Sequence, residues 1–168
     1  MANENIGYYG IDISKNGMNT AAKLSKEISW IVGTNNKLPY HDNSVDLVIS
    51  VFSPIKWTES ERVLKPNELV IVINPNRDHL MEMKKVIYPS IIEKEENRNE
   101  FDSYNFSKVD RKIIKETIYL KKEELKDLLL MTPHYWMTTK ESKENLYALD
   151  SLDVGIEVII DVYKNKIN

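Results

Sequence analysis

The chain has 168 residues, of which 42% are hydrophobic and 29% charged, with a formal net charge of −3 and no cysteine. This composition fits a globular domain with a sizeable core, lacks the basic excess of a free-standing nucleic-acid binder, and excludes disulfides, thiolate zinc sites and cysteine nucleophiles. The sequence shows no secretion leader and no apolar run near the roughly 20 residues that span a bilayer, so we expect one cytoplasmic domain over residues 1–168.

The order of predicted elements indicates an α/β fold. Short apolar runs predict strands, and apolar residues at helical spacing predict helices. Strands are predicted at residues 8–13, 28–32, 45–51, 69–73, 112–120 and 154–163, and helices at residues 15–26, 58–64, 78–87, 121–130 and 140–149. Alternating strands and helices favour a mainly parallel sheet covered on both faces. Because helices separate the last two strands, we expect the terminal strand to be inserted antiparallel.

Three local signals add detail to these elements. The Ser14 hydroxyl can cap the first helix by accepting a backbone N–H bond. Thr58 and Glu61 have the spacing of a capping box for the short helix that follows. The polar stretch 93–105, EKEENRNEFDSYN, is expected to be a loop or an insertion.

An acidic residue stands at the end of the first predicted strand, in the segment GIDISK. A carboxylate at the carboxyl end of a parallel strand can accept hydrogen bonds from two ribose hydroxyls, so Asp12 is a candidate for a nucleotide site. The alternative is an acid that caps the helix or closes the turn, and spacing alone favours this alternative.

Two other loops follow predicted strands and therefore lie at the edge of the sheet where ligands bind. In the loop 33–39, backbone amides and the side chain of Thr34 or Asn35 could contact an adenine. Phe52-Ser53-Pro54 could present a hydroxyl and carbonyls, but it is not a nucleophile elbow because G-x-S-x-G is absent. For both loops the plain alternative is a connecting turn. The three histidines are too far apart in sequence to predict a metal site.

Four segments together resemble one family. GIDISK, VGTNNKLPYHDNSVDLVISVFSP, ERVLKPNELVIVINPNRDHLMEMKKVIY and LLLMTPHYW are similar to segments of the 23S ribosomal RNA (guanine-N1)-methyltransferases, in the same order and from Tyr9 onward. The more specific marks are HLMEMK and MTPHYW. The resemblance implies a Rossmann-like class I methyltransferase sheet, mainly parallel with an antiparallel terminal strand. It also implies S-adenosyl-L-methionine as methyl donor and ribosomal RNA as substrate.

The resemblance also implies roles for individual residues. Asp12 matches the acid on the cofactor ribose, Gly33 and Thr34 match the loop beside the adenine, and Leu38 would help wall the adenine pocket. The implied cofactor-binding residues are Asp12, Ile13, Gly33, Thr34, Leu38, Phe52, Ser53 and His79, and the implied substrate-side residues are Pro54, Pro133 and Trp136. Guanine N1 must lose a proton in such a reaction, and the sequence does not identify the residue that accepts it.

The chain departs from the family near its start. The family has a cysteine-rich zinc module and a first strand that ends in a glycine-rich loop, and neither is present here. We therefore expect an N-terminally truncated fold that lacks the usual first strand, whose place is between the second and fourth strands. The two edges could close directly on each other, be covered by a second copy in a homodimer, or pair with a complementing N-terminal polypeptide. The chain would accordingly be either an active methyltransferase or a non-catalytic relative, including one half of a split enzyme.

Overall fold

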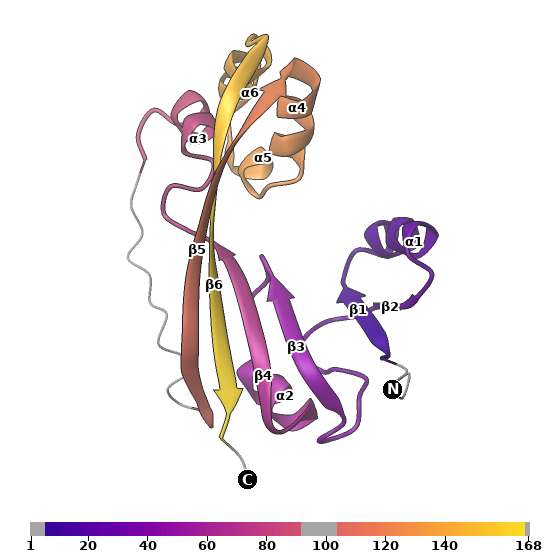
Figure 1. The fold of residues 1–168 in the computed structure, drawn as a ribbon. Coiled ribbons are helices and arrows are strands. Elements are labelled where there is room, and N and C mark those ends of the chain that lie inside the picture. The colour runs from indigo at the N-terminus through magenta and orange to yellow at the C-terminus, as the bar shows by residue number, and fades with distance from the viewer. Residues whose placement is uncertain (1–5, 92–103, 167–168) are drawn as a thin grey trace.

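A computed structural model describes residues 6–91 and 104–166, and over these residues the strands and helices follow the expected order, with one short helix at His134–Met137 that was not predicted (Figure 1). Residues 93–103 of the polar stretch lie outside the described residues. The strands are β1 (Tyr8–Asp12), β2 (Ile28–Val32), β3 (Val45–Val51), β4 (Leu64–Pro75), β5 (Phe106–Lys121) and β6 (Ser151–Asn165). The helices are α1 (Lys15–Leu24), α2 (Trp57–Val63), α3 (Met81–Ile87), α4 (Lys122–Leu130), α5 (His134–Met137) and α6 (Lys140–Tyr147).

The described strands form two sheets. β1 pairs with β2 in parallel, with Tyr8 opposite Ile28 and Asp12 opposite Val32. The second sheet has the order β3-β4-β6-β5, in which β3 is parallel to β4 while β6 is antiparallel to both β4 and β5. Within this sheet β3, β4 and β5 run in one direction and β6 runs in the other. The prediction of a mainly parallel sheet with an antiparallel terminal strand is confirmed.

β1 and β3 do not pair with each other. In the strand order, β1 has only β2 as a neighbour and β3 has only β4, within the described part of the chain. Figure 1 shows β1, β2 and α1 standing apart, beside the edge of β3 that faces away from β4. Direct closure of these two strands, one of the three expected arrangements, is therefore excluded.

Two hydrophobic clusters hold the second sheet. In the first, the Trp57 ring of α2 lies 5.1 Å from the ring of Phe106 and 4.8 Å from that of Tyr163, measured between centroids. The second cluster packs α3, α4 and α6 against one end of β6, and its buried residues are Leu80, Met83, Ile87, Leu125, Leu129, Leu146 and Val154. Both clusters therefore pack helix residues against β4 or β6.

The local predictions had different outcomes. The Ser14 hydroxyl accepts a bond of 3.1 Å from a backbone N–H in the first turn of α1, so this cap is confirmed. The capping box of Thr58 and Glu61 is wrong, because α2 starts without a side-chain cap and Glu61 accepts bonds from Asn105. Asn67 adopts the left-handed backbone, with φ 65°, in the turn of β4. None of the helices in the two described ranges is long and apolar enough to cross a membrane.

Candidate functional site

The predicted site residues follow the carboxyl ends of β1, β2, β3 and β4. The Gly33 amide donates a hydrogen bond of 3.0 Å to the Asp12 carbonyl, which places the ends of β1 and β2 side by side. The Asn35 side-chain amide donates to the Pro54 carbonyl, so the loop after β2 also reaches the turn after β3. Three strand ends that are separated in sequence therefore meet at one edge of the structure, as parallel α/β sheets generally arrange their ligand sites.

Asp12 closes the turn between β1 and α1. Its Oδ1 accepts a bond of 2.7 Å from the Ser14 backbone N–H, so the turn-closing role that spacing favoured is present. The residue is nevertheless exposed, and a carboxylate can accept about four hydrogen bonds. The next residue, Ile13, is also exposed. The Asp12 carboxylate can thus accept the Ser14 N–H of its own turn and, at the same time, accept hydrogen bonds from hydroxyl groups of a ligand.

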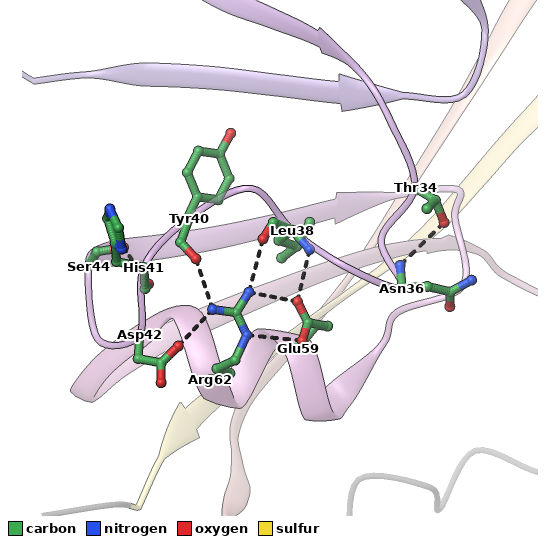
Figure 2. Close-up of polar contacts among 9 residues, drawn as sticks. All are labelled: Thr34, Asn36, Leu38, Tyr40, His41, Asp42, Ser44, Glu59 and Arg62. Atoms are coloured by element: carbon green, nitrogen blue, oxygen red, sulfur yellow. Dashed lines mark hydrogen bonds and ion pairs between the residues drawn. The ribbon is translucent and has the colours of Figure 1, made fainter.

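Arg62 of α2 holds the loop between β2 and β3 (Figure 2). We call Arg62 and Glu59, with the bonds that they make to this loop, the clamp. Its guanidinium donates to the carbonyls of Leu38 at 2.9 Å and Tyr40 at 2.8 Å, and to the Asp42 carboxylate at 2.7 Å. Glu59 bonds the same guanidinium and accepts a bond of 2.8 Å from the Leu38 N–H. This clamp fixes Leu38, the predicted wall of the adenine pocket.

An open pocket lies over the clamp. It is lined by Asn36, Lys37, Leu38, Pro39, Tyr40, His41, Glu59 and Arg62. Of the predicted cofactor residues it includes Leu38, whereas Asp12, Phe52 and His79 do not line it. Gly33 and Thr34 also lie outside the lining, so Leu38 is the one predicted cofactor residue, among those described, that faces this pocket.

The clamp should make stability depend on pH. Hydrogen bonding to Arg62 lowers the pKa of Glu59 from 4.5 to about 2. Because the folded-state pKa lies below the ordinary value, ionised Glu59 stabilises the fold above about pH 4.5, and this contribution is lost as the pH falls toward 2. We expect the free energy of unfolding to drop across this window more steeply in the natural chain than in Glu59→Gln. Urea unfolding on either side of the window checks this, and equal slopes would contradict it.

Phe52 and His79 meet beyond the ends of β3 and β4. Phe52 has left-handed backbone, with φ 49°, and its N–H donates a bond of 2.8 Å to the Ile73 carbonyl. The two rings lie 5.6 Å apart between centroids. Burial lowers the pKa of His79, and its Nδ1 accepts a bond of 3.3 Å from the Glu157 N–H. The imidazole is therefore neutral at pH 7, with its proton on Nε2.

The remaining predicted residues lie farther along the chain or in turns. The Ser53 carbonyl accepts a bond of 3.0 Å from the Ser50 hydroxyl, which closes the turn after β3. Pro133 precedes α5, and Trp136 on that helix is 82% exposed. The side chain of His134, also on α5, bonds the Tyr88 hydroxyl at 2.8 Å. No hydrogen bond or ring contact joins Trp136 to Asp12 or Phe52 in the described residues, so its substrate-side role stays a prediction.

The clamp and the Asn35–Pro54 link were not predicted. Glu59 and Arg62 have i, i+3 spacing, which signals a pair on one helix face. Apart from the Asp42 carboxylate, their further partners are backbone groups of Leu38 and Tyr40, more than 20 residues away. Backbone donors and acceptors carry no side-chain identity, so the sequence offered no signal for these contacts.

Comparison with known proteins finds methyltransferases among the proteins that are similar to this chain. A family described as "Methyltransferase domain" matches residues 1–72. YxjB of Bacillus subtilis (strain 168), which carries a provisional 23S rRNA (guanine-N(1)-)-methyltransferase name, is 29% identical over 154 residues, covering 90% of this chain and 55% of YxjB. The 23S rRNA (guanine(748)-N(1))-methyltransferase of Streptomyces fradiae is 26% identical over 129 residues, covering 75% and 46% of the two chains. This chain thus spans about half the length of the curated relatives that it matches.

Solved structures share the fold. YcgJ from Bacillus subtilis has a TM-score of 0.59 at 13% identity and covers 96% of this chain and 83% of that chain. A provisionally named methyltransferase of Bacillus halodurans C-125 has a TM-score of 0.57 at 10% identity, with 95% and 83% covered. The chain therefore has a class I methyltransferase fold, a methyltransferase-domain match over residues 1–72, and relatives named as 23S rRNA (guanine-N1)-methyltransferases.

Proposed function

We propose that this chain forms part of an S-adenosylmethionine-dependent methyltransferase that modifies N1 of a guanine in 23S rRNA, in the cytoplasm. The observation that carries the proposal is the meeting of the Asp12, Gly33 and Pro54 segments at one edge of the structure. The names of the sequence relatives support the choice of substrate.

The residues present fit one part of the cofactor. The exposed Asp12 carboxylate suits two ribose hydroxyls, which are neutral donors that a carboxylate binds strongly. Gly33 and Thr34 suit the adenine, and Leu38, farther along the same loop, is held by Arg62 and Glu59. Among the described residues no glycine-rich loop is present for the methionine part. The chain therefore supplies the nucleoside side of the site.

Catalysis in this site would depend chiefly on alignment. S-adenosylmethionine supplies a methyl group on a sulfonium, which is already a good leaving group. Phe52, Ser53 and Pro54 would place the guanine edge, since their turn is fixed by backbone and side-chain bonds. His79, with its proton on Nε2, would act as a hydrogen-bond donor and not as the acceptor of the guanine proton.

A second candidate function is a non-catalytic chain, or one half of a split enzyme. The separation of β1 from β3 favours it, because the sheet that should support the site is interrupted. Methyl transfer distinguishes the two. We expect a 23S rRNA transcript to gain labelled methyl groups, with primer extension stopping at the N1-methylated guanine. The full chain is assayed alone and with the region of YxjB that lies outside the match. If neither the chain alone nor its mixture with that region methylates the transcript, the enzymatic proposal is overturned.

The ribose contact gives a sharper prediction. Replacing Asp12 with asparagine keeps the shape but removes the charge, so we expect affinity for S-adenosylmethionine to fall roughly tenfold or more. Calorimetric titration, with the unmatched region of YxjB added in trans, measures the change. Asp127→Asn on the exposed surface of α4 is the matched control and should bind as the natural chain does. If the natural chain, Asp12→Asn and Asp127→Asn bind S-adenosylmethionine with equal affinity, Asp12 does not contact the cofactor.

A further inference from the structure

Three titratable side chains converge beyond the carboxyl ends of β3 and β4. His79 lies in the segment between β4 and α3, Lys84 lies on α3, and His134 begins α5. Figure 1 shows α3 and α5 at the end of the second sheet toward which β3 and β4 point. Burial, and after it the positive charge of Lys84, lowers the pKa of both histidines, so the three groups are close enough to interact.

The backbone of α3 fixes this arrangement. The Lys84 N–H donates a bond of 2.9 Å to the Leu80 carbonyl, and the Tyr88 N–H donates a bond of 2.9 Å to the Lys84 carbonyl. Residues four apart lie on one face of a helix, so Leu80, Lys84 and Tyr88 form one row. The Tyr88 hydroxyl lies 2.8 Å from Nδ1 of His134, which docks α5 at the end of the row. Because His79 directly precedes Leu80, Lys84 lies between the two imidazoles along the row.

The Lys84 ammonium has no counter-ion in contact with it. The residue is half-buried, and no ion pair joins it to an acid within residues 6–91 and 104–166. Burial lowers its pKa, and Asp78 raises it from a distance. Glu157, which also acts on His79, is already occupied by the Lys115 ammonium at 2.5 Å and by the Asp78 N–H at 2.8 Å. Because removing a cation from water without a partner costs free energy, an anionic ligand would be favoured here.

The two imidazoles each have a ring nitrogen available to such a ligand. Nδ1 of His79 accepts a bond of 3.3 Å from the Glu157 N–H, and Nδ1 of His134 is bonded to the Tyr88 hydroxyl. Nε2 of either ring makes no hydrogen bond within the described part of the chain. An Nε2–H donates to anionic oxygens, and hydrogen bonds between charged groups are stronger than neutral ones. An ammonium beside two imidazoles therefore suits a phosphate group.

We propose that Lys84, His79 and His134 bind a phosphate group of the RNA nucleotide that is methylated. The choice of a guanine nucleotide rests on the proposed function. The Phe52 ring, in the turn that would place the guanine edge, lies 5.6 Å from the His79 ring between centroids, so the base and the phosphate of one nucleotide can occupy neighbouring positions. Phosphate contacts position a nucleic acid without reading its sequence. The three side chains would thus hold the nucleotide while the turn after β3 contacts the base.

Nuclear magnetic resonance of the imidazoles tests this site without a methyl donor. The full chain is titrated with the dinucleotide guanylyl-uridine and, as the matched probe without phosphate, with guanosine and uridine together. An anion stabilises the imidazolium form, so we expect the dinucleotide, but not the nucleosides, to raise the pKa of His79 and His134. Binding should strengthen as the pH falls from about 7.5 to about 6, because the imidazoles then gain protons. His41, the third histidine, should respond to both probes alike.

Adjacent lysines of α3 provide matched variants. Lys84→Gln removes the charge at the site, whereas Lys85→Gln removes that of an exposed neighbour. We expect Lys84→Gln to weaken dinucleotide binding roughly tenfold or more and Lys85→Gln to leave it unchanged. Because the half-buried ammonium is itself unfavourable without a partner, Lys84→Gln should unfold at the same or a higher denaturant concentration than the natural chain. Weaker binding then reports the lost charge and not misfolding.

Several results would overturn the proposal. These are equal responses of His79 and His134 to the dinucleotide and to the nucleosides, or binding by Lys84→Gln that equals that of the natural chain. A response to inorganic phosphate as strong as that to the dinucleotide would assign the site to a free anion, and a stronger response to S-adenosylmethionine would assign it to the cofactor carboxylate. Dinucleotide binding without methyl transfer would uphold the site and count against the enzymatic function alone.

Discussion

A Gly10→Ala chain is expected to lose the ordered β1–β2 pair and, with it, most of its affinity for S-adenosylmethionine. Gly10 lies opposite Trp30 in the register of the two strands. A Cβ atom at Gly10 would lie 2.3 Å from ring carbons of Trp30, closer than any real contact allows. The indole cannot easily move away, because its Nε1 donates a bond of 2.9 Å to the Ser25 carbonyl. Overpacking of this kind costs about 1–3 kcal/mol.

Hydrogen exchange of β1 and β2, together with calorimetric titration of the cofactor, measures the Gly10→Ala effect. Gly33→Ala is the matched control for stability, because its added Cβ would meet Ile11 at an ordinary 3.5 Å. Adding Trp30→Leu to Gly10→Ala should restore part of the protection, since it removes the ring that clashes. Protection in Gly10→Ala equal to that of the natural chain would show that the strand pair does not depend on this contact.

Trp57→Ala should be the most destabilising single substitution in the hydrophobic cluster that packs α2 against the second sheet. Trp57 is buried in van der Waals contact with two other aromatic rings, and its removal leaves a cavity that the stiff strands β4, β5 and β6 cannot fill. We expect the free energy of unfolding to fall by about 3–5 kcal/mol. Because α2 also carries Glu59 and Arg62, the loop that holds Leu38 should lose its clamp in the same variant.

Denaturant unfolding tests the Trp57 prediction, and the chain offers a matched control. Trp136 is 82% exposed, so Trp136→Ala should change the free energy of unfolding by no more than about 0.5 kcal/mol. If Trp136→Ala keeps its stability but loses methyl transfer to RNA, the exposed indole has the substrate-side role implied by the family. A Trp57→Ala chain as stable as the natural one would contradict the cavity argument.

The sequence predicted the order of the elements because each strand has an apolar run at its centre. It underestimated the strand lengths where pairing continues through polar residues. The fifth strand was expected at 112–120, yet it extends from Phe106, opposite Asn165, to Lys121, opposite Ser151. Those outer positions are stabilised by the ladder with β6, which is a property of the partner strand and not of the local composition.

The site could be predicted for residues that stand directly at the carboxyl end of a strand. Asp12 and Gly33 follow strands directly, and parallel pairing brings them together. The Arg62 clamp was not predictable, since its bonds join one side chain to distant carbonyls. Whether β1 and β3 would pair with each other could also be predicted only in part. Their apolar edges could have closed directly, and the strand order of the described residues shows that they do not.

The strand order also determines how an assembly can grow. A free edge at the side of a sheet is a template for open-ended stacking of further copies. The second edges of β1 and β3 are different, because they lie beside each other at one gap, where further copies have no room to stack. The outer edges are poor templates as well: β2 has only five residues, and β5 carries Lys108, Arg111, Lys112, Lys115 and Lys121. Open-ended association through strand edges, and with it fibre growth, is therefore disfavoured.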